Sequence, residues 1–137
     1  MPKFCIGGKT VIDEDNKRYN LTNQLQVSFV NKSQKINAEF INTCQWQNLN
    51  KKALLFGNKT EAYLLKCNLK NISKLEQFVI SVEQPNIDHF EIFDSNYKSL
   101  KKTGDIYSWD TREFKESYPS FSLHLTKNSS QTYYFLV

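Results

Sequence analysis

The stretch Ala62-Tyr63-Leu64-Leu65-Lys66-Cys67-Asn68-Leu69 decides the fold class, because it carries the clearest alternating pattern in the chain. Side chains along a β-strand alternate between two faces. One face of this stretch holds residues that are apolar or aromatic, namely Tyr63, Leu65, Cys67 and Leu69. The other face holds Leu64, Lys66 and Asn68. We therefore expect a strand that buries one face in a core.

Short apolar runs recur on both sides of this stretch at a spacing of about ten residues, which is typical of an all-β sandwich or barrel. Further strands are expected at 9–12, 76–83, 87–93, 97–100, 120–125 and 132–137, with turns at 13–16, 85–86, 94–96, 102–105 and 127–130. Residues 23–29 are ambiguous, because Leu21, Leu25 and Phe29 are spaced by four, as in a short helix. No internal repeat or linker interrupts the pattern, so the sequence predicts one antiparallel β-sandwich domain over residues 1–137.

Composition and charge exclude several classes of protein. The 137 residues include 18 basic and 14 acidic side chains, a formal net charge of +4. An aromatic content of 14% excludes the disordered class. The lysines are scattered and the arginines are Arg18 and Arg112, so we expect no nucleic-acid partner.

No run approaches the length of a membrane span. No secretion signal is visible at the N-terminus and the last apolar run reaches Val137, which suggests a segment of a longer, exported protein.

The sequence offers no support for catalysis, a cofactor or a bound metal. Cys5, Cys44 and Cys67 lack the paired spacing of zinc ligands, and His89 and His124 lie far from them in sequence. Cys67 is best interpreted as a small buried hydrophobic residue. Residues 13–16 resemble part of a calcium loop but lack its glycine and its bidentate glutamate. Neither histidine lies in a recognisable nucleophile motif, so we expect no enzyme activity.

Candidate ligand-binding residues gather in Gly104-Asp105-Ile106-Tyr107-Ser108-Trp109-Asp110-Thr111-Arg112. Aromatic faces stack on sugars or bases, while Asp and Arg make directional hydrogen bonds to hydroxyls and carboxylates. The proposed ligand-binding residues are Asp105, Tyr107, Trp109 and Arg112. A structural role stands beside this hypothesis: Trp109 would plug the end of the sandwich, and Arg112 would pair with Asp105 to brace the loop. Trp46, flanked by glutamines, is a second candidate, and a core position is its alternative.

The order of these motifs from Val11 to Val137 resembles the type 2 extracellular sensor domain of bacterial seven-transmembrane receptors with diverse intracellular signalling modules. The similar stretches are Val11-Ile12-Asp13-Glu14-Asp15, Tyr63-Leu64-Leu65-Lys66-Cys67-Asn68-Leu69-Lys70-Asn71, Pro85-Asn86-Ile87-Asp88-His89-Phe90-Glu91-Ile92-Phe93, Thr103-Gly104-Asp105 with Arg112 downstream, Phe121-Ser122-Leu123-His124-Leu125 and Tyr133-Tyr134-Phe135-Leu136-Val137. Three positions depart from the family pattern. Leu64 stands where the family has Trp, Lys66 where it has Arg, and Phe93 where it has Tyr.

The resemblance implies a jelly-roll-like antiparallel β-sandwich similar to carbohydrate-binding modules. It places the domain on the periplasmic or extracellular face of the bacterial inner membrane, followed by seven transmembrane helices and an intracellular signalling module. We therefore expect a non-catalytic sensor domain that binds a small polar ligand such as a carbohydrate. Two alternatives stay open: a protein-interaction module that forms a homodimer, and an accessory carbohydrate-binding module of a polysaccharide-degrading enzyme.

Overall fold

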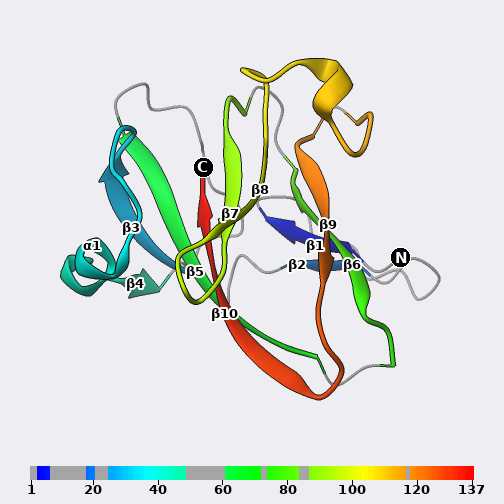
Figure 1. The fold of residues 1–137 in the computed structure, drawn as a ribbon, viewed down its shortest axis with the longest axis horizontal. Helices are drawn as coiled ribbons and strands as arrows, with labels where there is room; N and C mark the ends of the chain where they lie inside the picture. The colour runs from blue at the N-terminus through cyan, green and yellow to red at the C-terminus, as the bar shows by residue number, and fades with distance from the viewer. Residues whose placement is uncertain are drawn as a thin grey trace.

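The computed structural model describes residues 3–6, 18–20, 25–48, 61–71, 74–83, 87–116 and 118–137, which form a mostly β structure with little helix (Figure 1). The strands are β1 (Lys3–Ile6), β2 (Arg18–Asn20), β3 (Gln26–Asn31), β4 (Gln47–Asn48), β5 (Glu61–Asn71), β6 (Gln77–Val82), β7 (Phe90–Phe93), β8 (Ser99–Thr103), β9 (Ser120–His124) and β10 (Ser129–Leu136). The helices are α1 (Ala38–Thr43) and the 3-10 helix η2 (Trp109–Thr111). The turns expected at 13–16 and 85–86, and the strand expected at 9–12, lie outside the described residues.

One sheet has six strands in the order β4-β3-β5-β10-β7-β8, and every neighbouring pair is antiparallel. The strand that opened the sequence analysis is β5, and it lies inside this sheet between β3 and β10. Its predicted faces are confirmed, because Leu65, Cys67 and Leu69 belong to the main core and Tyr63 packs against that core. The expected turn at 102–105 is wrong in part, since β8 continues to Thr103.

The other sheet has four strands in the order β2-β1-β6-β9. Strand β6 pairs with β9 in antiparallel fashion, but β1 runs parallel to both β2 and β6. The expectation of purely antiparallel sheets is therefore wrong for this sheet. Side chains alternate in the same way in parallel and antiparallel strands, so the sequence pattern does not fix the direction of pairing.

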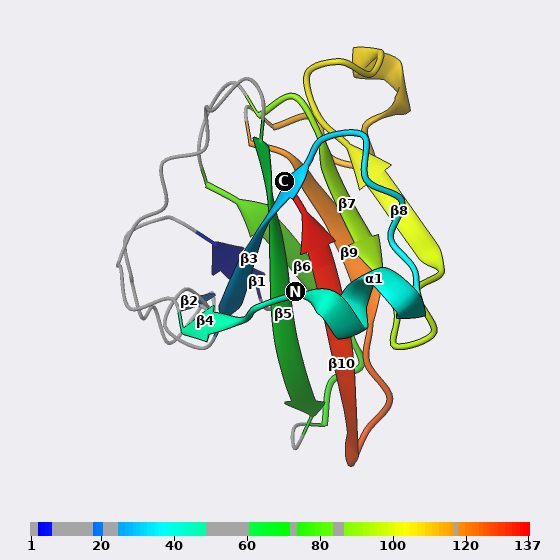
Figure 2. The same cartoon turned by 90° about the vertical axis from the view of Figure 1, so that its left-hand side faces the viewer.

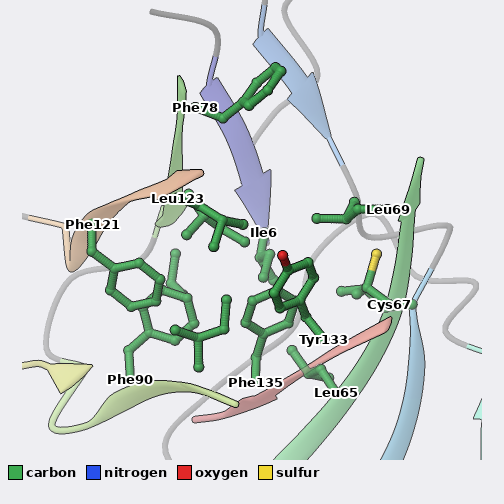
Figure 3. Close-up of a cluster of buried hydrophobic side chains, with 14 of the residues drawn as sticks. Ile6, Leu65, Cys67, Leu69, Phe78, Phe90, Phe121, Leu123, Tyr133 and Phe135 are labelled. Carbon is green, nitrogen blue, oxygen red and sulfur yellow. The ribbon is translucent and has the colours of Figure 1, made fainter. Parts of the chain in front are cut away.

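The two sheets pack against each other around a shared apolar core (Figure 3). Phe90 on β7 stacks on Phe121 of β9, with ring centroids 4.7 Å apart, and lies 5.9 Å from the ring of Phe135 on β10. The alternating faces predicted for β6 and β9 are confirmed, because their inward side chains enter this core: Phe78, Ile80, Val82, Phe121 and Leu123. This core holds β7 and β10 at fixed positions, and the candidate loop extends from the end of β8 beside them.

A second apolar cluster lies on the outer face of the six-stranded sheet, under α1 and the residues around it (Figure 2). The helical alternative for residues 23–29 is wrong, because Gln26–Asn31 form β3, which pairs with β5. Val27 enters the main core and Val30 enters the second cluster, and branched side chains of this kind favour strands. The helix forms later, at Ala38–Thr43, where the Asn37 side chain accepts a hydrogen bond from the amide of Phe40 at 2.9 Å.

Candidate functional site

The loop from Gly104 to Arg112 leaves the six-stranded sheet at the end where β10 also finishes. Leu136 of β10 pairs with Glu91, and Phe90 pairs with Thr103, so Thr103 and the C-terminus of the chain lie at the same end of the sheet. In both views the 3-10 helix of this loop, drawn in gold, projects beyond the strands (Figures 1 and 2).

Gly104 allows the loop to pack closely against the segment that precedes β7. Its φ of 139° lies in a region that L side chains rarely adopt, and an added Cβ would lie 2.2 Å from the carbonyl oxygen of Asp88. Two backbone hydrogen bonds follow directly: the amide of Asp105 donates to the carbonyl of Ile87 at 2.8 Å, and that of Ile106 donates to the carbonyl of Asp88 at 3.2 Å. The loop is therefore fixed at its start.

Arg112 fixes the other end of the loop. Its side chain is only 4% exposed, and Nη2 donates to Asp105 Oδ1 at 2.6 Å while Nη1 donates to the carbonyl of Glu116 at 2.8 Å. The guanidinium carbon lies 4.5 Å from the centre of the Trp109 ring, a cation–π contact. The pairing of Arg112 with Asp105, given above as the structural alternative, is present. Trp109 itself is 51% exposed, so it does not plug the end of the sandwich.

Tyr107 points toward β7 and ends a chain of polar side chains. Its hydroxyl lies 2.7 Å from His89 Nδ1, and His89 Nε2 lies 2.9 Å from Glu91 Oε1. Lys102 Nζ lies 5.8 Å from the centre of the Tyr107 ring. Burial, followed by the charge of Glu91, raises the pKa of Tyr107. The ring therefore keeps its hydroxyl proton throughout the neutral range of pH.

His89 and Glu91 were not among the residues singled out from the sequence as candidates. The signal that could have found them is their alternation on one face of the strand expected at 87–93, where a histidine and a glutamate lie between the apolar residues Ile87 and Phe93. In the structure both side chains are partly buried, at 26% and 15% exposure. Polar side chains that are partly buried and paired in this way are candidates for a functional role.

Trp46 lies apart from this loop. It immediately precedes β4 and packs against the second cluster, with its ring 6.0 Å from that of Tyr134 and Lys66 Nζ 5.4 Å from its centre. Strand β4 and α1 lie far from the 3-10 helix in both views (Figures 1 and 2). The structure therefore brings Asp105, Tyr107, Trp109 and Arg112 together in one loop and leaves Trp46 outside it.

The segment after the loop links the edges of the two sheets. Glu113 accepts hydrogen bonds from Lys101 Nζ of β8 at 3.0 Å and from the amide of Ser122 of β9 at 3.0 Å, and it also contacts the Ser122 hydroxyl. Burial alone would raise the pKa of Glu113, but the hydrogen bonds from Ser122 and Lys101, together with the charge of Lys101, lower it below the ordinary value. These contacts favour the ionised form of Glu113, so its carboxylate is charged where it links β8 to β9.

The described residues contain no group of three or more His, Cys, Asp or Glu side chains placed to hold a metal ion. The acidic residues 13–16 lie outside that part of the chain. Cys44 and Cys67 are free thiols, and burial raises the pKa of Cys67 to about 12, which agrees with its interpretation as a buried hydrophobic residue. Within the same described part, no helix has the length and apolar character to cross a membrane.

Comparison with protein families finds that the family model described as 7TMR-DISM extracellular 2 matches residues 21–137. The match includes the whole candidate loop, Trp46, and His89 with Glu91. Searches of curated proteins and of solved structures found no match.

Proposed function

Because the chain belongs to the 7TMR-DISM extracellular 2 family, we propose that it binds a small carbohydrate on behalf of a membrane receptor. Members of this family are extracellular sensor domains of seven-transmembrane receptors with diverse intracellular signalling modules. The chain is therefore extracellular, and its signalling output comes from the receptor to which such a domain is attached. This membership also favours a non-catalytic domain over an accessory module of a polysaccharide-degrading enzyme.

The observation that carries the proposal is the arrangement of Trp109 over Arg112. The indole is 51% exposed, while the guanidinium beneath it is buried and held by Asp105 and by the carbonyl of Glu116. An aromatic face held in place in this way loses little conformational entropy when a sugar ring stacks on it. The exposed carboxylates of Asp105 and Asp110 offer acceptors for sugar hydroxyls beside it.

The strand order supports a jelly-roll-like domain as the scaffold for this site. In the six-stranded sheet β5, β10, β7 and β8 are consecutive neighbours, while β6 and β9 pair in the other sheet. The chain therefore crosses between the sheets after β5, β6, β8 and β9, as it does in double-sheet jelly rolls. We include residues 1–137 in this single domain. In such a fold the connecting loops gather at the ends of the sheets, where the candidate loop lies.

Signalling requires more than tight binding. A ligand shifts the output only when it binds one arrangement of the receptor better than another. The candidate loop meets this requirement in principle, because it continues directly into Glu113, which links β8 to β9. A sugar that stacks on Trp109 more tightly when Arg112 is in place beneath it would favour the arrangement in which the Glu113 contacts are made.

Calorimetry with a panel of mono- and oligosaccharides tests the proposal. We expect at least one saccharide to bind, and we expect Trp109→Ala to weaken binding by about tenfold, as for the loss of one aromatic stacking contact. Tyr118→Ala is the matched control, because Tyr118 is also an exposed aromatic residue but lies outside the loop. The proposal is wrong if no saccharide binds, or if the two variants bind equally well.

The exposure of Ile106 favours a second candidate function, docking against a second copy of the chain. Ile106 is 65% exposed and Trp109, three residues later in the same loop, is 51% exposed, and apolar side chains that gather on one surface mark interaction sites. Sedimentation at increasing concentration would show association that Ile106→Ser abolishes. A monomer at every concentration would remove this candidate and leave the carbohydrate proposal intact.

A further inference from the structure

A chain of polar side chains runs from the candidate loop along the outer face of β7 and β8, and the proposed stacking site does not use it. Tyr107 contacts His89, His89 contacts Glu91, and the second oxygen of Glu91 accepts a hydrogen bond from the hydroxyl of Ser99. The chain connects a loop residue to the strands that carry the core. Its central member is a histidine, the side chain whose charge changes between about pH 5 and pH 8.

The positions of the hydrogens on the His89 ring follow from its two neighbours, Glu91 and Tyr107. The carboxylate of Glu91 only accepts hydrogen bonds, so His89 Nε2, 2.9 Å away, carries a hydrogen. In the neutral ring Nδ1 is then the acceptor, and the Tyr107 hydroxyl at 2.7 Å must donate to it. Neutral His89 therefore directs the hydroxyl hydrogen of Tyr107 inward, away from solvent and from any ligand.

Protonation of His89 reverses the second of these hydrogen bonds. In the imidazolium both ring nitrogens donate. Nδ1–H then donates to the oxygen of Tyr107, and the hydroxyl hydrogen of Tyr107 turns away from the ring. The proton that changes the system comes from solvent and resides on Nδ1, while Tyr107 keeps its own. No bond between heavy atoms forms or breaks.

Charged groups of both signs lie near His89. Glu91, on β7, has its Oε1 2.9 Å from Nε2 of His89. From β8, Lys102 is the Cα partner of Glu91, and its Nζ lies 5.8 Å from the centre of the Tyr107 ring, so it brings a positive charge to the same group of side chains. Asp88 precedes His89 with an exposed side chain. Leu136 of β10, which faces Glu91 across the sheet, adds no charge.

We propose that His89 is a positioning residue that switches the Tyr107 hydroxyl between an acceptor and a donor toward the ligand site. This regulation rests on the proposed function, because Tyr107 belongs to the same loop as Trp109. When His89 is neutral, Tyr107 offers lone pairs to sugar hydroxyls. When His89 is protonated, Tyr107 donates a hydrogen bond beside the ammonium of Lys102, an arrangement that suits the carboxylate of an acidic sugar.

Carbon NMR on the 137-residue chain tests the switch without any ligand. The Cζ signal of a tyrosine responds to whether its hydroxyl donates or accepts, and Tyr107→Phe assigns the signal. We expect the Tyr107 signal to shift with the same midpoint as the His89 ring. In His89→Gln it should stay flat. In His124→Gln it should titrate as before, since His124 lies on β9 beside Glu76, at 3.6 Å, and makes a matched control.

A second variant keeps the test decisive if His89→Gln fails to fold. Glu91→Gln replaces the carboxylate that accepts from His89 Nε2 with an amide, and the Tyr107 midpoint should move together with any movement of the His89 midpoint. A Tyr107 signal that stays flat while His89 titrates overturns the proposal. So does a Tyr107 midpoint that stays in place when that of His89 moves.

Binding measurements separate this proposal from the proposed function. Glucuronate should bind about fivefold more tightly at pH 5.5 than at pH 8, as expected for one gained hydrogen bond, and His89→Gln should remove the difference. Glucose serves as the neutral control. If the NMR switch is present and neither sugar binds, the switch stands and the carbohydrate proposal falls. If a sugar binds while Tyr107 stays flat, the switch falls and the carbohydrate proposal stands.

Discussion

Replacing Gly104 with alanine should detach the start of the candidate loop from the segment that precedes β7. The Cβ of alanine would lie 2.2 Å from the carbonyl oxygen of Asp88 and 2.8 Å from the Cα of His89. Both are backbone atoms, so no flexible side chain can move aside. The φ of 139° is also one that alanine rarely adopts. The loop must therefore shift away from Asp88 in the variant.

The cost has two parts. A residue held in a strained backbone conformation costs about 1–3 kcal/mol. A shift of the loop also weakens the hydrogen bonds that the amides of Asp105 and Ile106 donate, each contributing about 1 kcal/mol. When the backbone shifts to relieve its strain, the hydrogen bonds weaken, so the two costs do not add in full. We therefore expect the free energy of unfolding to fall by about 2–4 kcal/mol. Against a typical total stability of about 5–15 kcal/mol the fold survives, weakened.

Urea denaturation followed by tryptophan fluorescence measures this loss as a lower midpoint at an unchanged slope. Ser108→Ala is the matched control, because Ser108 lies in the same loop, is exposed, and makes no capping hydrogen bond with its side chain. We expect the control to change stability by less than about 0.5 kcal/mol. A loss below about 1 kcal/mol in Gly104→Ala would refute the close approach to Asp88 on which the loop's position depends.

Three further predictions follow from buried or paired groups. Asn71→Ala should lower the free energy of unfolding in urea by about 2–3 kcal/mol, because the buried amide of Asn71 donates to two backbone carbonyls. Because the pKa of Glu113 is lowered in the fold, its contribution is present above the ordinary value of 4.5 and lost as the pH falls through the folded value. Glu113→Gln should therefore flatten the acid side of the stability–pH curve. Cys67, with its pKa raised to about 12, should resist alkylation at pH 8 in the native protein and react in urea, as peptide mass spectrometry would show.

Strands with one apolar and one polar face could be predicted from the sequence, and strands that are buried on both faces could not be distinguished from them. The second half of β5 shows the first case, since Cys67 and Leu69 face the core while Asn68 and Lys70 are exposed. β6 shows the second, because its residues from Phe78 to Val82 are all buried. β1 (Lys3–Ile6) is not among the expected strands, and its direction could not be predicted either, since parallel pairing leaves no mark on the alternation of a short strand.

The candidate loop could be predicted from its composition, but its connections could not. Asp105, Tyr107, Trp109 and Arg112 are close in sequence, so any compact loop brings them near one another. His89 meets Tyr107 only because Gly104 lets the loop fold back on the segment before β7. Trp46 was drawn into the candidate set by residue type alone. Its ring packs on Tyr134, on the outer face of the sheet, a position that no local pattern indicates.

The position of Glu113 explains why this loop, rather than another, is suited to pass on a signal. Both sheets are held rigidly by the core, where Phe90 stacks on Phe121 across the interface. A small ligand cannot deform such packing, because cores respond poorly to strain. At the edge, however, β8 and β9 are joined by polar contacts of Glu113, which is adjacent in sequence to Arg112 and lies 38% exposed. If a sugar binds at Trp109 as proposed, its differential binding would act through Glu113 on these polar contacts at the edge of the sheets rather than on the packed core.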